Sequence, residues 1–194
     1  MSNQKSKIEN QKMGNQKSKI ENQKSFSNLL FHTAFCCMTC DGDIDKREVA
    51  LLNSMCAKLP LFEGFDFQTE ANLLIDKLNK EGKEFMTAYL HLLKTSSLTE
   101  DEEAQLIDIA IQTIKADDVV MYSEVKFFKT IRHRLKISDE KILEKHPDFE
   151  QYLEQDIITE TLLERITKQY LDIAELPKFE AIKIDGGLLE AEIK

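Results

Sequence analysis

The stretch AFCCMTCDGDIDKREVALL, residues 34–52, decides the fold class of this chain. Its first part carries apolar residues at helical spacing, and the acidic letters DGD then interrupt the pattern. Asp45 and Glu48 stand three positions apart, which is the spacing of a capping box, so a second helix is expected to begin there. The stretch therefore predicts a helix, an acidic loop and another helix.

A second copy of this pattern occurs 76 residues further along, in AIQTIKADDVVMYSEVKFF, residues 110–128. Asp41 corresponds to Asp117 and Glu48 to Glu124, and apolar residues recur at equivalent positions. The residue after each Asp is expected to need a positive φ, while each Glu lies in a first helical turn, where the dipole favours negative charge. Two such units are expected to pack about a pseudo-twofold axis, with their acidic loops close together.

These paired motifs resemble those of the TerB-like family, which is linked by name to tellurite resistance. The resemblance covers about residues 27–145, and the same fold occurs at the front of a membrane-anchored DnaJ-type co-chaperone. It implies an all-α fold with an internal duplication, acidic residues proposed to bind divalent cations, and an association with stress-response systems. The second copy has Asp118 where Gly is usual and Val119 where the first has Asp43, so it is expected to be the poorer ion site.

The rest of the chain predicts more helices and no strand. With 3 Pro and 6 Gly in 194 residues, it lacks the turns of a sandwich or barrel. The decapeptide NQKSKIENQK occurs twice near the start, which predicts a flexible or marginally helical polar tail over residues 1–25. The alternative is a basic arm that contacts an acidic partner or surface. A single domain of six or seven helices is expected over residues 26–176, followed by a loosely packed tail over residues 177–194. The later helices are expected at residues 71–78, 85–93, 99–114, 122–135 and 159–174.

Charge and composition restrict the classes of function. A net charge of −9 argues against a general nucleic-acid binder, which needs Lys and Arg to neutralise phosphates. No apolar run approaches the ~20 residues that span a bilayer, and the first residues lack the apolar part of a secretory signal. Three of the four Cys lie within residues 36–40, which is poor spacing for disulfides and favours a reducing cytoplasm.

The acidic loops are the candidate metal site. Asp41, Asp43 and Asp45 match the opening of an EF-hand, but Lys46 and Leu52 stand where that loop needs Gly and Glu. A looser site for a hard cation such as Ca²⁺ or Mg²⁺ remains open. The alternative is that the aspartates end helices and the glutamates only cap the next ones. The candidate ligands are Asp41, Asp43, Glu48, Asp117 and Glu124.

Two other features have a structural and a functional interpretation. Cys37 and Cys40 form a C-x-x-C, but no second such pair exists and no strand precedes it, so burial in the core is favoured over zinc or redox chemistry. The aromatic residues Phe62, Phe65 and Phe67 are expected to pin a loop to the core. The alternative is an exposed patch for a partner.

No pattern in the sequence indicates catalysis. The His residues are scattered, no His accompanies a Ser or Cys nucleophile in a known signature, and Gly186-Gly187 lacks the strand and helix of a phosphate loop. The sequence therefore favours a non-enzymatic, cytoplasmic TerB-like module that binds a divalent cation, protein partners, or both. The alternative is a ligand-free structural domain.

Overall fold

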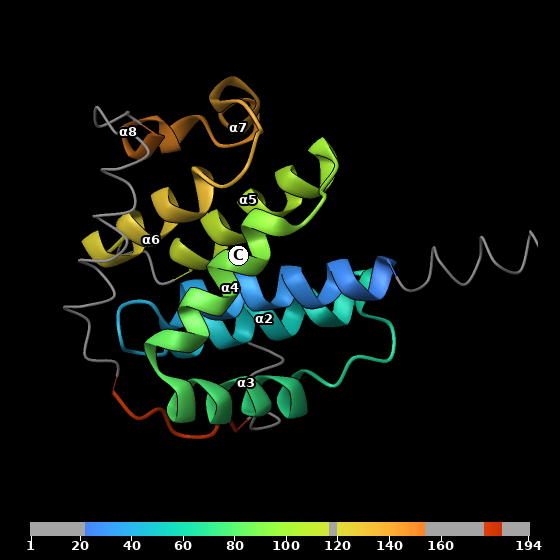
Figure 1. Ribbon diagram of the computed structural model, residues 1–194, viewed down its shortest axis with the longest axis vertical. Coiled ribbons are helices and arrows are strands. Elements are labelled where there is room, and N and C mark those ends of the chain that lie inside the picture. The colour runs from blue at the N-terminus through green and yellow to red at the C-terminus, as the bar shows by residue number, and fades with distance from the viewer. Residues whose placement is uncertain (1–21, 117–119, 154–176, 184–194) are drawn as a thin grey trace, which may run out of the picture.

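The computed structural model describes residues 22–116, 120–153 and 177–183. These residues contain eight α-helices and two 3-10 turns, with no strand among them, which confirms the predicted all-α class (Figure 1). The first helix covers residues 22–39. The others are α2 (Lys46–Lys58), α3 (Phe67–Glu81), α4 (Lys83–Thr95), α5 (Glu100–Ile114), α6 (Tyr122–Arg132), α7 (Asp139–Lys145) and α8 (Glu150–Leu153), with 3-10 turns η1 (Pro60–Phe62) and η2 (Pro147–Phe149).

Capping boxes begin three of these helices. At α2 the Asp45 carboxylate accepts from the amide of Arg47, and Glu48 reaches back to the amide of Asp45. Thr99 and Glu102 make the same reciprocal arrangement at α5. Because these bonds satisfy amides that the helix itself leaves unpaired, the predicted starts of α2 and α5 are confirmed.

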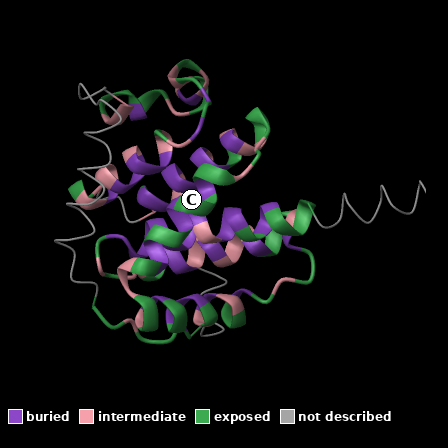
Figure 2. Cartoon of the chain, viewed as in Figure 1, coloured by how far each residue is buried: buried purple, intermediate pink, exposed green. Residues whose placement is uncertain are grey.

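The first helix lies at the centre of the molecule. It runs across the middle of Figure 1, with α3 below it and α7 and α8 above it. Figure 2 shows buried residues where helices face one another and exposed residues along the outside. Some apolar positions related by the 76-residue offset are buried in both copies, as Ala34 with Ala110 and Met38 with Ile114 illustrate. These apolar faces supply the main stabilisation of the helices.

The aromatic loop between α2 and α3 is attached to this core. Phe62 and Phe67 are buried, and the ring of Phe65 lies 4.8 Å from that of Phe31 and 5.2 Å from that of Phe62, centroid to centroid. Edge-to-face contacts at such distances add to the free energy gained by burial. The loop is therefore pinned to the core, as the structural interpretation of the three Phe residues predicts.

The ends of the described chain are more ordered than a flexible tail. Helical structure covers residues 22–25, at the end of the segment that the sequence assigned to a flexible or marginally helical tail. Residues 177–183 were predicted to be loosely packed, but they lie along α3 (Figure 1, red), and Ile182 is buried with 7% of its surface exposed. The helix predicted over residues 159–174 falls outside the described residues. Across the described part of the chain, no helix is both long and apolar enough to cross a bilayer.

Candidate cation site and neighbouring polar clusters

The first acidic loop joins the first helix to α2 and is held by its own side chains. Asp41 Oδ1 accepts a hydrogen bond of 3.0 Å from the amide of Asp43, and Asp43 Oδ1 accepts one of 2.9 Å from the amide of Ile44. Gly42 between them has φ 93°, the left-handed conformation that glycine adopts without a steric penalty. Both aspartates are exposed, so a cation could reach them from solvent.

The two glutamates of the repeat lie in a different environment. Glu48 has 6% of its surface exposed and Glu124 has 4%, although glutamate is among the residue types least often buried. Each occupies the third position of its helix. Glu48 Oε2 accepts from the amide of Asp45 at 3.0 Å, and Glu124 Oε2 accepts from the amide of Met121 at 2.6 Å. The equivalent residues of the two units therefore have the same local role.

Both buried carboxylates act on the same pair of thiols at the end of the first helix. Burial raises the pKa of Cys37 and Cys40 well above the ordinary value, and the negative charges of Glu48 and Glu124 raise it further. Charges from both units, which stand 76 residues apart in the sequence, therefore act on the thiols at this helix end. Asp41 adds to the charge acting on Cys40.

The five predicted ligands are thus distributed unevenly. Asp41 and Asp43 are exposed on the first loop, Glu48 and Glu124 are buried beside the helix end, and Asp117 lies outside the described residues. Within residues 22–116, 120–153 and 177–183, no three His, Cys, Asp or Glu side chains come close enough together to hold a metal ion. A cation site would have to be completed by Asp117 or by movement of the first loop.

The cysteines belong to the core, as the sequence predicts. All four are buried without a disulfide, and Cys40 Sγ donates to the carbonyl of Cys37 at 3.0 Å. Burial also raises the pKa of Cys36 well above its usual range, and that of Cys56 to about 12. These thiols therefore stay protonated at neutral pH, in the form that is neither a metal ligand nor a nucleophile.

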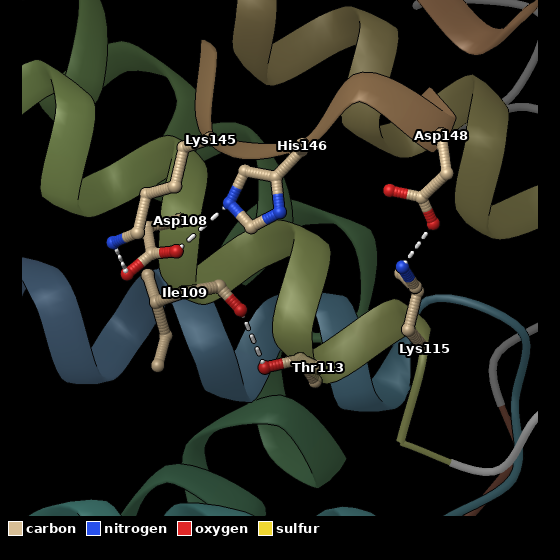
Figure 3. A network of polar contacts seen from close by, with 7 residues as sticks. All are labelled: Asp108, Ile109, Thr113, Lys115, Lys145, His146 and Asp148. Carbon is tan, nitrogen blue, oxygen red and sulfur yellow. Dashed lines mark hydrogen bonds and ion pairs between the residues drawn. The ribbon is translucent and has the colours of Figure 1, made fainter. Parts of the chain in front are cut away.

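A polar network between α5 and the segment around α7 and η2 escaped the sequence analysis (Figure 3). Asp108 on α5 pairs with Lys145 Nζ at 2.6 Å and with His146 Nε2 at 2.8 Å, and Lys115 pairs with Asp148. The partners stand more than thirty positions apart in sequence, so no local motif marks them. The network attaches α7 and η2 to α5, beside a pocket of 340 Å³ lined in part by Arg47, Lys115 and His146.

Residues 177–183 form one wall of a larger pocket against the first acidic loop. The pocket measures 540 Å³, and its other wall includes Gly42, Asp43 and Val49. A Cβ added to Gly42 would lie 3.2 Å from Cδ of Pro177, so the loop and this segment are in close contact. The sequence contained one signal for this contact, namely the large apolar side chains of Phe179 and Ile182 in a stretch assigned to a tail.

Comparisons with protein-family models, with curated proteins and with solved structures find no match to this chain. Function must therefore be inferred from the chain's own residues. The most informative are the pair Glu48 and Glu124 and the contacts of residues 177–183, because both join parts of the chain that are remote in sequence.

Proposed function

We propose that this chain is a non-enzymatic, TerB-like module that binds a divalent cation between its two acidic units and docks protein partners. The observation that carries the cation proposal is the pair of buried glutamates, Glu48 and Glu124, which come from equivalent positions of the two units and act on one helix end. Four buried thiols that form no disulfide support a reducing, cytoplasmic location.

The electrostatics of this pair favour a cation. A cation bound between Glu48 and Glu124 would interact favourably with both carboxylates and reduce the repulsion between them. Carboxylate oxygens are the ligands that Ca²⁺ and Mg²⁺ prefer. Asp41 and Asp43 on the first loop, together with Asp117, are the residues we propose to complete the site. Occupancy would then hold the two units together and stabilise one partner-binding surface.

The second candidate is a ligand-free structural domain, and one observation favours it. Glu48 and Glu124 already accept hydrogen bonds from the amides of Asp45 and Met121, so each has a structural role without any ion. Glu102 provides an internal comparison, because it closes the same kind of capping box at α5. Replacing a cap that has no ion-binding role should leave the effect of cations on the protein's stability unchanged.

Thermal unfolding of the EDTA-treated full chain, with Ca²⁺, Mg²⁺ or Zn²⁺ added, tests the cation proposal. We expect one ion to raise Tm progressively with concentration, and calorimetric titration to register its binding. The double variant E48Q/E124Q should lose this response. The matched control E102Q alters a cap of the same geometry and should keep it. No heat and no shift in Tm with any of the three ions at millimolar concentration would instead support the ligand-free domain.

A further inference from the structure

Two asparagines on α3 bind the backbone of residues 177–183 in the same way. Asn79 accepts from the amide of Phe179 and donates to its carbonyl, both at 2.8 Å. Asn72 accepts from the amide of Ile182 at 2.8 Å and donates to its carbonyl at 3.2 Å. Gln68 adds a bond of 3.4 Å to the same carbonyl. Each asparagine therefore satisfies both backbone groups of one residue, as a neighbouring strand would.

The spacing of these contacts matches a helix to an extended chain. Asn72 and Asn79 are seven residues apart, which is roughly 10.5 Å along a helix that rises about 1.5 Å per residue. Phe179 and Ile182 are three residues apart, or roughly 10 Å in a chain that advances about 3.3 Å per residue. The segment runs antiparallel to α3, because Asn79 holds the earlier residue and Asn72 the later one.

Side chains add selectivity to these backbone contacts. Ile182 is buried in the core cluster, and Phe179 packs against the same cluster from a partly exposed position. Between them and the body of the protein lies the 540 Å³ pocket, whose wall includes Ile44, Val49 and the charged Asp43. Lys178 donates to the carbonyl of Asn79 near the end of α3. The surface therefore fits a peptide with a basic residue, an apolar residue directly after it, and a second apolar residue three positions further on.

We propose that the face of α3 bearing Gln68, Asn72 and Asn79 is a groove for an extended peptide, and that residues 177–183 are its resident occupant. A partner protein presenting a segment of the same chemistry, with a lysine followed by two apolar residues three positions apart, displaces that occupant. Backbone bonds from asparagine are indifferent to side-chain identity, so the groove accepts another chain as readily as its own. This identifies a surface for the partner docking proposed above, and it is independent of the cation.

The resident segment makes the groove self-inhibited. It is joined to the body by the same chain, so it competes at an effective concentration of the order of millimolar, whereas a separate peptide competes only at its bulk concentration. Its anchorage consists mainly of two apolar side chains, a few hydrogen bonds at partly exposed positions and the contact of Pro177 with the first acidic loop. A peptide offered in trans should thus bind weakly until the resident segment is released.

Fluorescence anisotropy with a labelled synthetic peptide of residues 177–183, PKFEAIK, tests this proposal in EDTA, where cation binding plays no part. The full chain carrying F179D/I182D has its resident anchors disabled, and we expect it to bind the peptide at least about tenfold more tightly than the unaltered chain, because self-competition is removed. Adding N72A/N79A to the F179D/I182D chain should abolish this gain in peptide affinity. A peptide with Asp at both anchor positions should not bind.

Two controls separate groove loss from misfolding. Asn53 is a partly buried asparagine on α2, so N53A in the F179D/I182D chain should leave peptide affinity unchanged. Far-UV circular dichroism and Tm should show that the N72A/N79A chain remains folded. Equal peptide affinity in the unaltered and F179D/I182D chains overturns the self-inhibited groove. Retained affinity in a folded N72A/N79A chain overturns the role of the asparagines. Neither outcome bears on the cation proposal.

Discussion

Buried glutamate has more than one role in this protein. Glu48 and Glu124 each accept a hydrogen bond from the amide of the residue just before their own helix, whereas Glu103 accepts from a remote loop. Glu103 Oε2 receives the amides of Lys136 and Ile137, both at 2.7 Å, and only 6% of its surface is exposed. Hydrogen bonds to a charged acceptor are stronger than those between neutral groups, so this single carboxylate fixes the chain between α6 and α7.

Replacing Glu103 with alanine should lower the free energy of unfolding by about 3 kcal/mol, since two buried amides would lose their charged acceptor. Urea unfolding followed by circular dichroism measures this difference. E103Q keeps an acceptor oxygen without the charge and should cost less than E103A. A loss for E103A within about 0.5 kcal/mol of zero would mean that the loop amides find other partners.

At the scale of elements, α7 is short and depends on ion pairs for its position. Its seven residues bury only Ile142, and its end is attached to α5 through Lys145 and His146 on Asp108. Burial alone would raise the pKa of Asp108, but the hydrogen bonds from Lys145, Gln112 and His146 hold it below the ordinary value (Figure 3). The charged form of this carboxylate therefore contributes to the attachment of α7.

The pH dependence of this contribution has a definite sign. A carboxyl whose pKa is lower in the folded state stabilises the fold at pH values above its unfolded pKa, near 4, and loses that effect as pH falls through the folded pKa. D108N should therefore lower the free energy of unfolding at pH 7 by about 1–3 kcal/mol, which a lower Tm would report. The difference in Tm from the unaltered chain should shrink at about pH 3. A difference that is constant from pH 7 to pH 3 would show that the charge of Asp108 is not involved.

At the scale of the whole molecule, the first acidic loop lies against a part of the chain more than 130 residues later in sequence. Gly42 has a positive φ, and a side chain at this position would contact Pro177. The same loop carries Asp41 and Asp43, so residues 177–183, which occupy the α3 groove, also lie beside the candidate cation site.

Gly42→Ala measures the contact between loop and segment, with Gly64→Ala as its matched control. Both glycines have a positive φ, 93° and 77°, so alanine should cost each about 1 kcal/mol in backbone strain. A Cβ at Gly64 meets nothing within 4 Å, whereas one at Gly42 meets Pro177. We expect G42A to lower the free energy of unfolding by about 1 kcal/mol more than G64A. In the F179D/I182D chain, G42A and G64A should lower the free energy of unfolding equally. A larger loss for G42A in that chain would show that Pro177 stays in place.

The sequence was most informative where the signal is local. The capping residues Asp45 and Thr99 mark the starts of α2 and α5, because a cap and its amide lie within one turn. The burial of the cysteines and of the aromatic loop also followed from residue type and spacing. The extent of α6 was less predictable. It ends at Arg132 rather than near residue 135, because a turn there presents amides to Glu103, a residue of another helix.

The sequence by itself determined the all-α class and the starts of α2 and α5, since these depend on periodicity and on contacts within a few residues. Only the tertiary structure decided that Glu48 and Glu124 both act on the thiols of one helix end, and that residues 177–183 bind along α3. Asn79 and Phe179 are 100 positions apart, and either could pair with water equally well in an extended chain. Such contacts form only when the packing of the helices has set the distance between them, which no local pattern encodes.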